Sequence, residues 1–513
     1  MRQIYILWAL LVGISFKSTA QTLDPTFGDQ GKVITSVGPN STLMRTVIQQ
    51  DGKIVGLIML PFSLNGNLVL VRYNSDGTID TTFGVDGFVY TALIDELGFL
   101  DKILLLPDDS ILVCGMTLAA IQDLQFAVAK FDADGAPDAT FGSGGIAAAN
   151  LSNLGEVVYS VDVDSLGRVV VGGGARTTIA GGNHFAVTRY MPNGSPDDSF
   201  GIAGVIILDV PEDHSESVTS IKVLDSGKIL LVGNSSDISD EMDETGILLV
   251  RLNADGATDN SFGDSGRQVH SFANQHAVLS SKLNDDGSVF VSGYVSDAGL
   301  RGLIAKFTPV GNLDDSFGED GRIITPDLGL FGNVLQMGGT LYCGGTIAGD
   351  ASALFQVRAF NLEGDPISAF GENGVFAFGM TESFNDFGGV LTLQADGKML
   401  INGRTTSGGI TSCALARLEL ESLSTTRQST GFVSFGPNPF TNQIRIDFGA
   451  ELPGNISFDL ADVSGKLIAS NLSNSIDGIN SRVISPPNNL ERGVYFLTVN
   501  HNDKRSVIKV IKE

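Results

Sequence analysis

The chain has 513 residues, of which 42% are hydrophobic, and it carries 63 glycines and a formal net charge of −26. This length suits about three domains or one long repeat array, and the apolar content is sufficient for a large core. The acidic excess argues against binding to nucleic acid or to anionic membrane surfaces. Three cysteines and five histidines exclude a disulfide framework and leave little material for a metal or acid–base centre.

Residues 1–20 have the pattern of a secretory signal peptide. Arg2 supplies the positive start, Ile4 to Phe16 form an apolar run, and Ser18-Thr19-Ala20 is a small-residue cleavage site before Gln21. The run is shorter than the roughly 20 apolar residues that a membrane-spanning helix needs. We therefore expect the chain to leave the cytoplasm without a membrane span.

Residues 21–421 contain one unit repeated seven times. Its signature is Phe-Gly-x-x-Gly, which recurs every 53 to 62 residues with Phe at positions 27, 83, 141, 200, 262, 317 and 370. Each unit continues with a short apolar stretch, two strands around a tight turn, and a third strand that ends at a second glycine turn. Asp-Gly between alternating apolar runs is a strong hairpin signal, because glycine adopts the positive φ that the turn requires. About four strands per unit, without helical periodicity, predict an all-β, seven-bladed β-propeller.

The repeat resembles a known sequence family. Leu23-Asp24-Pro25-Thr26-Phe27-Gly28 and Leu313-Asp314-Asp315-Ser316-Phe317-Gly318 are similar to the delta-60 repeat, in which this motif precedes a strand and an Asp-Gly-Lys hairpin. The resemblance covers residues 22 to about 421. It implies the propeller fold and carries no established activity.

Three polar positions recur together in the repeat. They are a basic residue near the end of the third strand, an Asp three residues before Phe-Gly, and a Ser or Thr directly before the Phe. The sets include Arg72, Asp80 and Thr82, and Arg251, Asp259 and Ser261. One junction loses all three at once, with Ala359, Ile367 and Ala369 in their places. This joint loss predicts a hydrogen-bonded ion-pair network within each blade rather than a ligand site.

The last unit has its basic residue, Arg417, but no Phe-Gly segment after it. The chain begins with that missing segment, from Leu23 to Gly31. We therefore expect the N-terminal segment to dock beside Arg417, so that Asp24 completes the last blade and closes the ring.

Metal binding and catalysis have weaker support in the sequence. Asp132-x-Asp134-Gly135-x-x-Asp138 resembles the end of a calcium loop, but Lys130 occupies the position of the first ligand, which makes calcium a minor alternative. The histidines show no metal or catalytic spacing, and buried free thiols are the expectation for Cys114, Cys343 and Cys413. The acidic segment from Asp237 to Glu244 interrupts the fourth unit and suggests a solvated loop or a recognition loop.

The C-terminal part differs from the repeats. Residues 422–431 form a Ser/Thr-rich linker, and residues 432–513 contain short alternating runs typical of a small Ig-like β-sandwich. This region resembles the type A sorting domain of the type IX secretion system. The positions that carry the resemblance, in order, are Pro437, Asn438, Pro439, Gly465, Lys466, Gly493, Tyr495, Lys509 and Lys512. The resemblance implies recognition by the secretion machinery, export across a Gram-negative outer membrane after periplasmic transit, and a secreted or cell-surface location.

Two functional hypotheses follow from the sequence. The favoured one is a non-catalytic propeller without a cofactor that binds protein or glycan, or has a structural role, at the cell surface. The alternative is a secreted glycan-active hydrolase or lyase on the same scaffold. No catalytic constellation is recognisable, and the sequence does not indicate a nucleic-acid partner.

Overall fold

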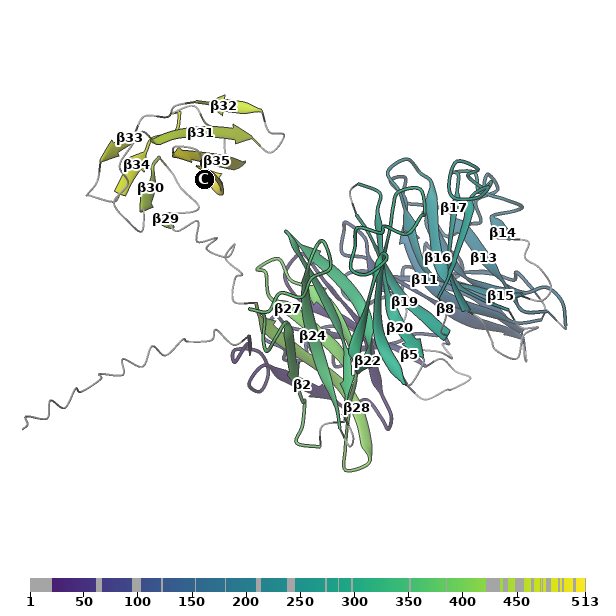
Figure 1. Cartoon of the computed structure of the whole chain (residues 1–513). Helices are drawn as coiled ribbons and strands as arrows, with labels where there is room; N and C mark the ends of the chain where they lie inside the picture. The colour runs from purple at the N-terminus through teal and green to yellow at the C-terminus, as the bar shows by residue number, and fades with distance from the viewer. Residues whose placement is uncertain are drawn as a thin grey trace, which may run out of the picture. The chain divides into compact units, whose positions relative to one another are not determined.

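The computed structural model describes residues 21–420, except 61–66, 95–102, 121–122, 153, 180, 209–213, 238–244, 273–274, 285, 297–298, 350–351 and 384. Of the C-terminal part it describes 434–436, 442–447, 456–462, 466–470, 472, 474–476, 481–487, 490, 493–501 and 504–512. The chain divides into two compact units, Met1–Leu420 and Glu421–Glu513 (Figure 1). The predicted signal peptide and the predicted linker lie outside the described residues.

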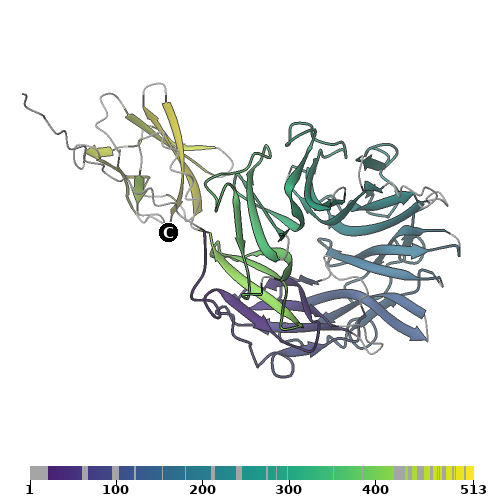
Figure 2. The same cartoon turned by 60° about the horizontal axis from the view of Figure 1, so that its bottom comes forward.

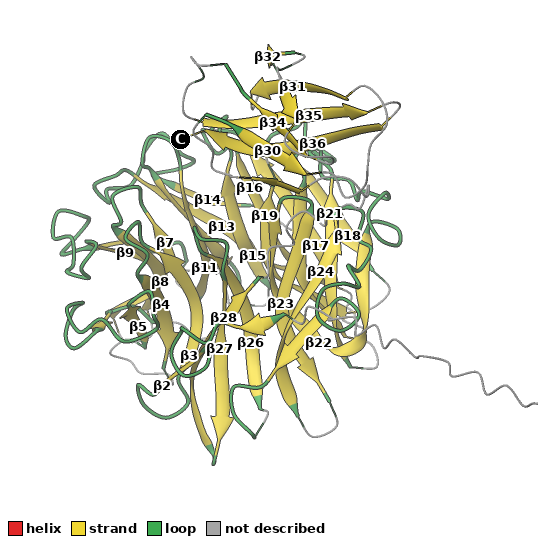
Figure 3. Ribbon diagram, turned by 90° about the vertical axis from the view of Figure 1, so that its left-hand side faces the viewer, coloured by secondary structure: helices red, strands yellow, loops and turns green. Residues whose placement is uncertain are grey.

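The secondary structure of the described residues is β-strand throughout, joined by turns and loops (Figure 3). We find no helix there, and so none that would cross a membrane. The all-β class expected from the periodicity is confirmed.

The larger unit consists of successive antiparallel strand groups, which we call blades 1 to 7. Blade 1 contains β3 (Thr42–Ile48), β4 (Ile54–Met59), β5 (Leu68–Tyr73) and β6 (Phe88–Tyr90). Blade 2 contains β7 (Ile103–Leu105), β8 (Ile111–Ala120), β9 (Asp123–Phe131) and β10 (Ile146–Ala149). Blade 3 contains β11 (Glu156–Val163), β12 (Val169–Arg176), β13 (Asn183–Tyr190) and β14 (Val205–Ile207). Blade 4 contains β15 (His214–Val223), β16 (Ile229–Asp237), β17 (Thr245–Leu252) and β18 (Arg267–Ser271).

Blades 5 and 6 share one long strand. Blade 5 contains β19 (Gln275–Leu283), β20 (Val289–Ser296), β21 (Leu300–Phe307) and the first part of β22 (Arg322–Met337). Blade 6 contains the rest of β22, β23 (Thr340–Ala348), β24 (Ala353–Asn361) and β25 (Val375–Phe378). Blade 7 contains β26 (Asp386–Leu393), β27 (Met399–Ser407), β28 (Ile410–Glu419) and two N-terminal strands, β1 (Thr22–Leu23) and β2 (Lys32–Thr35).

The two ends of the propeller meet in blade 7. Leu23 pairs with Leu418 and Val33 with Leu415, so the N-terminal segment supplies the outer edge of the last sheet. Strand β3 of blade 1 in turn contacts β26, β27 and β28. In Figure 2 the purple N-terminal strands accordingly lie beside the green strands of blade 7. A propeller closed in this way is held by non-covalent contacts between its two ends.

The core lies between neighbouring blades rather than in one central mass. One cluster joins Val55 and Leu57 of β4 to Val113 of β8 and Ala127 of β9, and others join blades 2 and 3, 3 and 4, and 4 and 5. Both faces of an inner blade strand are therefore covered, which explains near-continuous apolar runs such as β5, in which all six residues are buried. A blade needs its neighbours to bury its apolar surface.

The strand directions give the propeller two chemically different faces. The turns between first and second strands lie at one end of each blade, together with the Phe-Gly-x-x-Gly loops; we call this end the hairpin face. The connections between second and third strands, and those between blades, lie at the opposite end, which we call the loop face. This separation follows from the antiparallel order of the strands.

The smaller unit contains two antiparallel sheets. One has the order β29 (Ser434–Gly436), β30 (Ile444–Asp447), β34 (Ser481–Ile484) and β33 (Asn474–Ile476). The other has the order β32 (Leu467–Ala469), β31 (Ile456–Asp462), β35 (Gly493–His501) and β36 (Lys504–Lys512). Ile446 and Ile484 of the first sheet share one core with Phe458 and Leu497 of the second.

Candidate functional site

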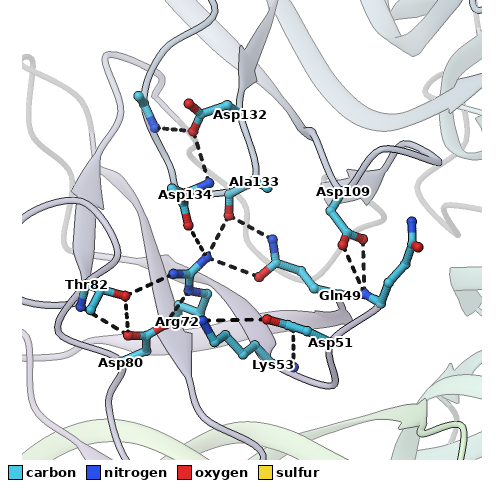
Figure 4. A network of polar contacts seen from close by, with 12 residues as sticks. Gln49, Asp51, Lys53, Arg72, Asp80, Thr82, Asp109, Asp132, Ala133 and Asp134 are labelled. Carbon is cyan, nitrogen blue, oxygen red and sulfur yellow. Dashed lines mark hydrogen bonds and ion pairs between the residues drawn. The ribbon is translucent and has the colours of Figure 1, made fainter.

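The repeated polar positions form a dense network on the hairpin face, shown for blade 1 in Figure 4. Arg72 Nε donates to Asp80 Oδ2 at 2.7 Å, and the Thr82 hydroxyl donates to Asp80 Oδ1 at 2.6 Å. Arg72 Nη2 reaches Thr82 Oγ1 at 3.3 Å. Arg72 is only 2% exposed, so its charge is held by these partners rather than by water.

The same contacts recur in three other blades. The Nε atom of the arginine lies 2.6 to 2.7 Å from the aspartate in the pairs Arg189–Asp197, Arg251–Asp259 and Arg417–Asp24. In blades 2 and 5 a lysine replaces the arginine, and the pairs are Lys130–Asp138 at 2.9 Å and Lys306–Asp314 at 2.8 Å. The structure thus brings together the residues that the sequence coupled.

The network is not confined to one blade, contrary to our expectation. Arg72 Nη1 donates to the carbonyl oxygen of Ala133, in the turn of blade 2, at 2.7 Å. Arg251 Nη1 donates to Pro309 O of blade 5 at 3.0 Å. Arg189 and Arg417 make the equivalent bonds to Ala254 O and Ser75 O. Each arginine therefore joins its own blade to the next one.

The Phe-Gly signature serves the same junctions. The amide of its first glycine donates to a carbonyl oxygen in the next blade's turn; these pairs are Gly28–Asp76, Gly84–Asp134, Gly142–Asn193, Gly201–Asp255, Gly263–Val310 and Gly318–Glu363. The Phe ring lies under the arginine, as with Arg251 4.6 Å above Phe262. A Cβ on Gly311, in the next blade's turn, would lie 2.6 Å from that same ring. The Phe is an anchor between blades, and the turn glycine leaves room for it.

A second cation on the aspartate was missed by the sequence reasoning. Lys53 lies 3.1 Å from Asp80, Arg168 lies 3.3 Å from Asp197, and the same relation holds for Lys228–Asp259 at 2.8 Å and Lys398–Asp24 at 2.6 Å. These cations follow the glycine of the first turn. Where the third strand carries lysine instead of arginine, this turn position is Ser110 or Ser288. The two positions therefore vary together in the sequence. A unit with arginine on its third strand has a cation after the turn glycine, and a unit with lysine there has serine. This covariation between the repeats was the available signal for the second cation.

Blade 6 explains why the polar positions disappear together. Its position for the arginine is Ala359, which is fully buried, and Tyr342 opposite packs edge-on to Phe370 at 5.7 Å. An arginine here would need a turn after the third strand of blade 7. That strand, β28, ends at Glu419, and the outer edge of its sheet is the N-terminal segment. The described residues provide no acceptor turn after β28. A buried arginine at position 359 would lack that partner, which accounts for the apolar set in place of the polar one.

The closing contact of the propeller uses the same chemistry as the internal junctions. Asp24 is fully buried and accepts from Arg417 and Lys398, although 393 residues separate it from Arg417. Asp24 N also donates to Arg417 O at 2.8 Å. Burial would raise the pKa of Asp24, but hydrogen bonds from Lys398 and Thr26 outweigh it and hold the pKa well below its usual range.

The remaining predicted residues fall into two groups. Pro437, Asn438, Pro439 and Gly465 of the sorting motif lie outside the described residues. Lys466 is exposed, Gly493 begins β35, Tyr495 is buried in the same strand, and Lys509 and Lys512 lie in β36. The structure therefore assembles part of the motif on the paired strands β35 and β36.

The alternative metal and thiol sites have ordinary structural partners. In the calcium-like segment, Asp132 accepts from the amides of Asp134 and Ala136, and Asp138 accepts from Thr140 and Lys130. No group of three metal-ligating side chains occurs among the residues that the structure describes. Cys114, Cys343 and Cys413 are all buried, and none of them forms a disulfide.

Two cavities lie at junctions between blades. The one on the hairpin face, of about 400 Å³ between blades 5 and 6, contains Lys306, which is paired with Asp314, and Lys282, which donates to Leu283 O. The one on the loop face has a volume of about 330 Å³. It is lined by Asn40, Ala353, Asn385, Asp386, Phe387, Arg404, Thr406 and Thr411, and we call it the loop-face pocket.

Comparison with known families identifies both units. A model described as "Domain of unknown function (DUF5122) beta-propeller" matches residues 49–83, 106–141, 167–200 and 225–262. A model described as "Secretion system C-terminal sorting domain" matches residues 435–513. The chain contains DUF5122 β-propeller repeats and a C-terminal sorting domain. The resemblances found in the sequence are confirmed, and this propeller is exported by type IX secretion to the cell surface or the medium.

The likeness to solved structures is distant. The full extracellular region of plexin A4 aligns with 92% of this propeller chain at 8% identity and a TM-score of 0.45, and the chain spans 60% of that protein. A second plexin A4 structure is covered to 52% of its length. The sialidase of Trypanosoma rangeli in complex with sialic acid aligns with 96% of the chain, and 89% of its own length is covered, at 11% identity and a TM-score of 0.33. No curated protein matches the sequence significantly.

Proposed function

We propose that the protein is an exported, non-catalytic propeller that binds a glycan or protein ligand at the cell surface through its loop face. The observation that carries this proposal is the contrast between its two faces. The repeated network occupies the hairpin face with contacts between blades, whereas the loop-face pocket is built from residues outside the repeated network. Loops on a rigid scaffold are the usual place for recognition.

The composition of the loop-face pocket supports binding rather than hydrolysis. Asp386 is the single carboxylate among the residues that line it. Glycoside hydrolysis normally uses two carboxyl groups on either side of the scissile bond. The pocket otherwise offers amide, hydroxyl and guanidinium groups, which form hydrogen bonds but do not supply a nucleophile and an acid.

The proposal is tested by hydrogen exchange on the exported protein recovered from outside the cell, both free and added back to washed cells that lack it. We expect amide protection in Asp386–Leu393 and at the start of β28, with the Asp-Gly turns of the hairpin face unchanged. An Asn385→Ala variant should lose the protection, and Asn312→Ala, an exposed asparagine on the hairpin face, should retain it. Protection confined to the hairpin face would contradict the proposal.

The enzymatic alternative is tested with the same protein on a set of neutral and acidic oligosaccharides. We expect retention of ligand without shortening of any chain. Cleavage products that disappear in an Asp386→Asn variant would replace binding with catalysis as the function.

A further inference from the structure

Arg404 stands out in the loop-face pocket because its charge is not balanced there. It is half-buried in β27, and its guanidinium carbon lies 4.9 Å above the ring of Phe387. In the described part of the chain no carboxylate or other hydrogen-bond acceptor contacts this guanidinium. The repeat arginines of the hairpin face, by contrast, each have an aspartate within 2.7 Å. A partly desolvated cation without an anion is costly unless a ligand supplies one.

Asp386, the carboxylate of the same pocket, does not fill this role. In register it faces Thr405, whereas Arg404 faces Phe387, so the two side chains leave opposite sides of the sheet. Burial raises the pKa of Asp386, and the charge of Lys32 opposes this shift. The Oδ2 atom of Asp386 accepts from the amide of Met380 at 2.9 Å. Asp386 is fully buried, and its Oδ1 has no hydrogen-bond partner within the described ranges.

The rest of the pocket offers hydrogen-bonding groups in excess. Asn40 and Asn385 are exposed at its rim, and neither amide side chain has a partner among the residues described. The hydroxyls of Thr406 and Thr411 lie 2.8 Å apart on the β27–β28 hairpin. Ala353 is the one purely aliphatic residue of the lining, and the Phe387 ring lies beneath Arg404. Such a lining suits a ligand that is polar around its whole circumference.

The volume of the pocket limits the size of that ligand. About 330 Å³ is at the lower end of the range of roughly 300–1,000 Å³ for small-molecule sites. It accommodates one sugar ring rather than a folded segment. An acidic peptide side chain would give Arg404 its carboxylate, but its methylene groups would leave the side-chain amides of Asn40 and Asn385 without a partner.

We propose that the loop-face pocket binds one acidic sugar residue of the uronic acid class, with its ring carboxylate on the guanidinium of Arg404 and its hydroxyls on Asn40, Asn385 and the paired threonines. A planar guanidinium matches a carboxylate with two parallel hydrogen bonds. The inference rests on the proposed function and names the ligand class of the same site. It also gives a reason for the half-buried cation Arg404 in a chain whose formal net charge is −26.

The test is calorimetric titration of the full chain with D-glucuronate and D-galacturonate, and with glucose, galactose and acetate as matched probes that lack the carboxylate or the ring. We expect a uronate to bind at least tenfold more tightly than the neutral sugar and than acetate. Arg404→Gln should weaken uronate binding at least tenfold, and Arg404→Lys should weaken it less. Arg322→Gln, which removes another arginine stacked on a ring, Phe272, is the control and should leave binding unchanged.

Thermal melts of each variant separate lost binding from lost folding, and a folded Arg404→Gln that still binds the uronate with full affinity would overturn the assignment. Equal binding of neutral sugars, or of an acidic peptide in competition, would overturn the uronate class while the loop-face function stands. Absence of uronate binding together with absence of loop-face protection on cells would overturn both.

Discussion

The guanidinium of Arg72 donates to the carbonyl oxygen of Ala133, 61 residues later in the chain, at 2.7 Å. Asp80 holds the opposite side of the same guanidinium at 2.7 Å. One side chain thus satisfies a carboxylate of its own blade and a turn of the next. Because the core also lies between blades, these contacts fix the register in which neighbouring apolar faces meet.

The two cations on one aspartate lead to an asymmetric mutational effect. Asp259 accepts from Arg251 at 2.6 Å and from Lys228 at 2.8 Å. We expect Asp259→Ala to lower the free energy of unfolding by about 3–5 kcal/mol, because two cations lose their partner. Arg251→Ala should cost less, about 2 kcal/mol, since Lys228 still neutralises Asp259. Urea denaturation of both single variants and the double variant gives the coupling energy; a value below about 0.5 kcal/mol would contradict the pairing.

Closure of the propeller predicts a different response at two chemically matched aspartates. Asp24→Ala and Asp197→Ala each remove a buried aspartate from an arginine 2.7 Å away and a second cation. Both should cost about 3–5 kcal/mol. Only Asp24→Ala should also release the N-terminal segment, because both strands of that segment, β1 and β2, pair with the single strand β28 at the edge of blade 7. Limited proteolysis should then cut before β3 in Asp24→Ala and not in Asp197→Ala; equal resistance would argue against this mode of closure.

The lowered pKa values of the repeat aspartates also predict a loss of stability in acid. Hydrogen bonds from Thr140 and Lys130 lower the pKa of Asp138 to about 2. Hydrogen bonds from Lys228, Ser261 and Arg251 outweigh burial and also hold the pKa of Asp259 well below its usual range. An unfolded aspartate has a pKa near 3.9. The stabilisation is therefore complete above about pH 5 and is lost as the pH falls towards 2, since the unfolded state binds protons first. The free energy of unfolding, measured from pH 7 to pH 3, should fall, and Asp259→Asn should make the fall shallower.

A comparison of two turn glycines distinguishes the cost of backbone strain from the cost of steric crowding. Gly256 has φ +91°, and a Cβ there would lie 3.0 Å from the Phe200 ring and 2.2 Å from Ile206. Gly397 has φ +85° and no atom within 4 Å of a Cβ. Gly397→Ala should cost about 1 kcal/mol from strain alone, and Gly256→Ala should cost a further 1–3 kcal/mol. Equal melting temperatures for the two variants would show that the Phe anchor does not depend on this glycine.

The buried thiols should not react with a thiol reagent in the folded protein. Burial raises the pKa of Cys413 to about 12 and also raises the pKa of Cys343. Since the thiolate is the reactive form, a thiol reagent at pH 8 should label the protein only when it unfolds. Rapid labelling of the native chain would show that blades 6 and 7 open around these residues.

The sequence by itself determined the class of the fold and its repeat. Phe-Gly-x-x-Gly, the Asp-Gly turns and the apolar runs are local features, and local backbone geometry is what glycine and β-branched residues control. The coupled loss of the polar set at Ala359, Ile367 and Ala369 also indicated that the residues act together.

Only the tertiary structure decided where the second half of each contact lies. Backbone carbonyl oxygens such as Ala133 O carry no side-chain identity, so sequence patterns cannot reveal them as partners of Arg72. The same holds for the loop-face pocket. Its lining comes from three different blades or their connections, as with Asn40, Ala353 and Arg404. Only the closure of the propeller brings these residues together in one pocket. Repetition revealed the scaffold, whereas the unrepeated residues that we propose bind a ligand depend on packing between blades.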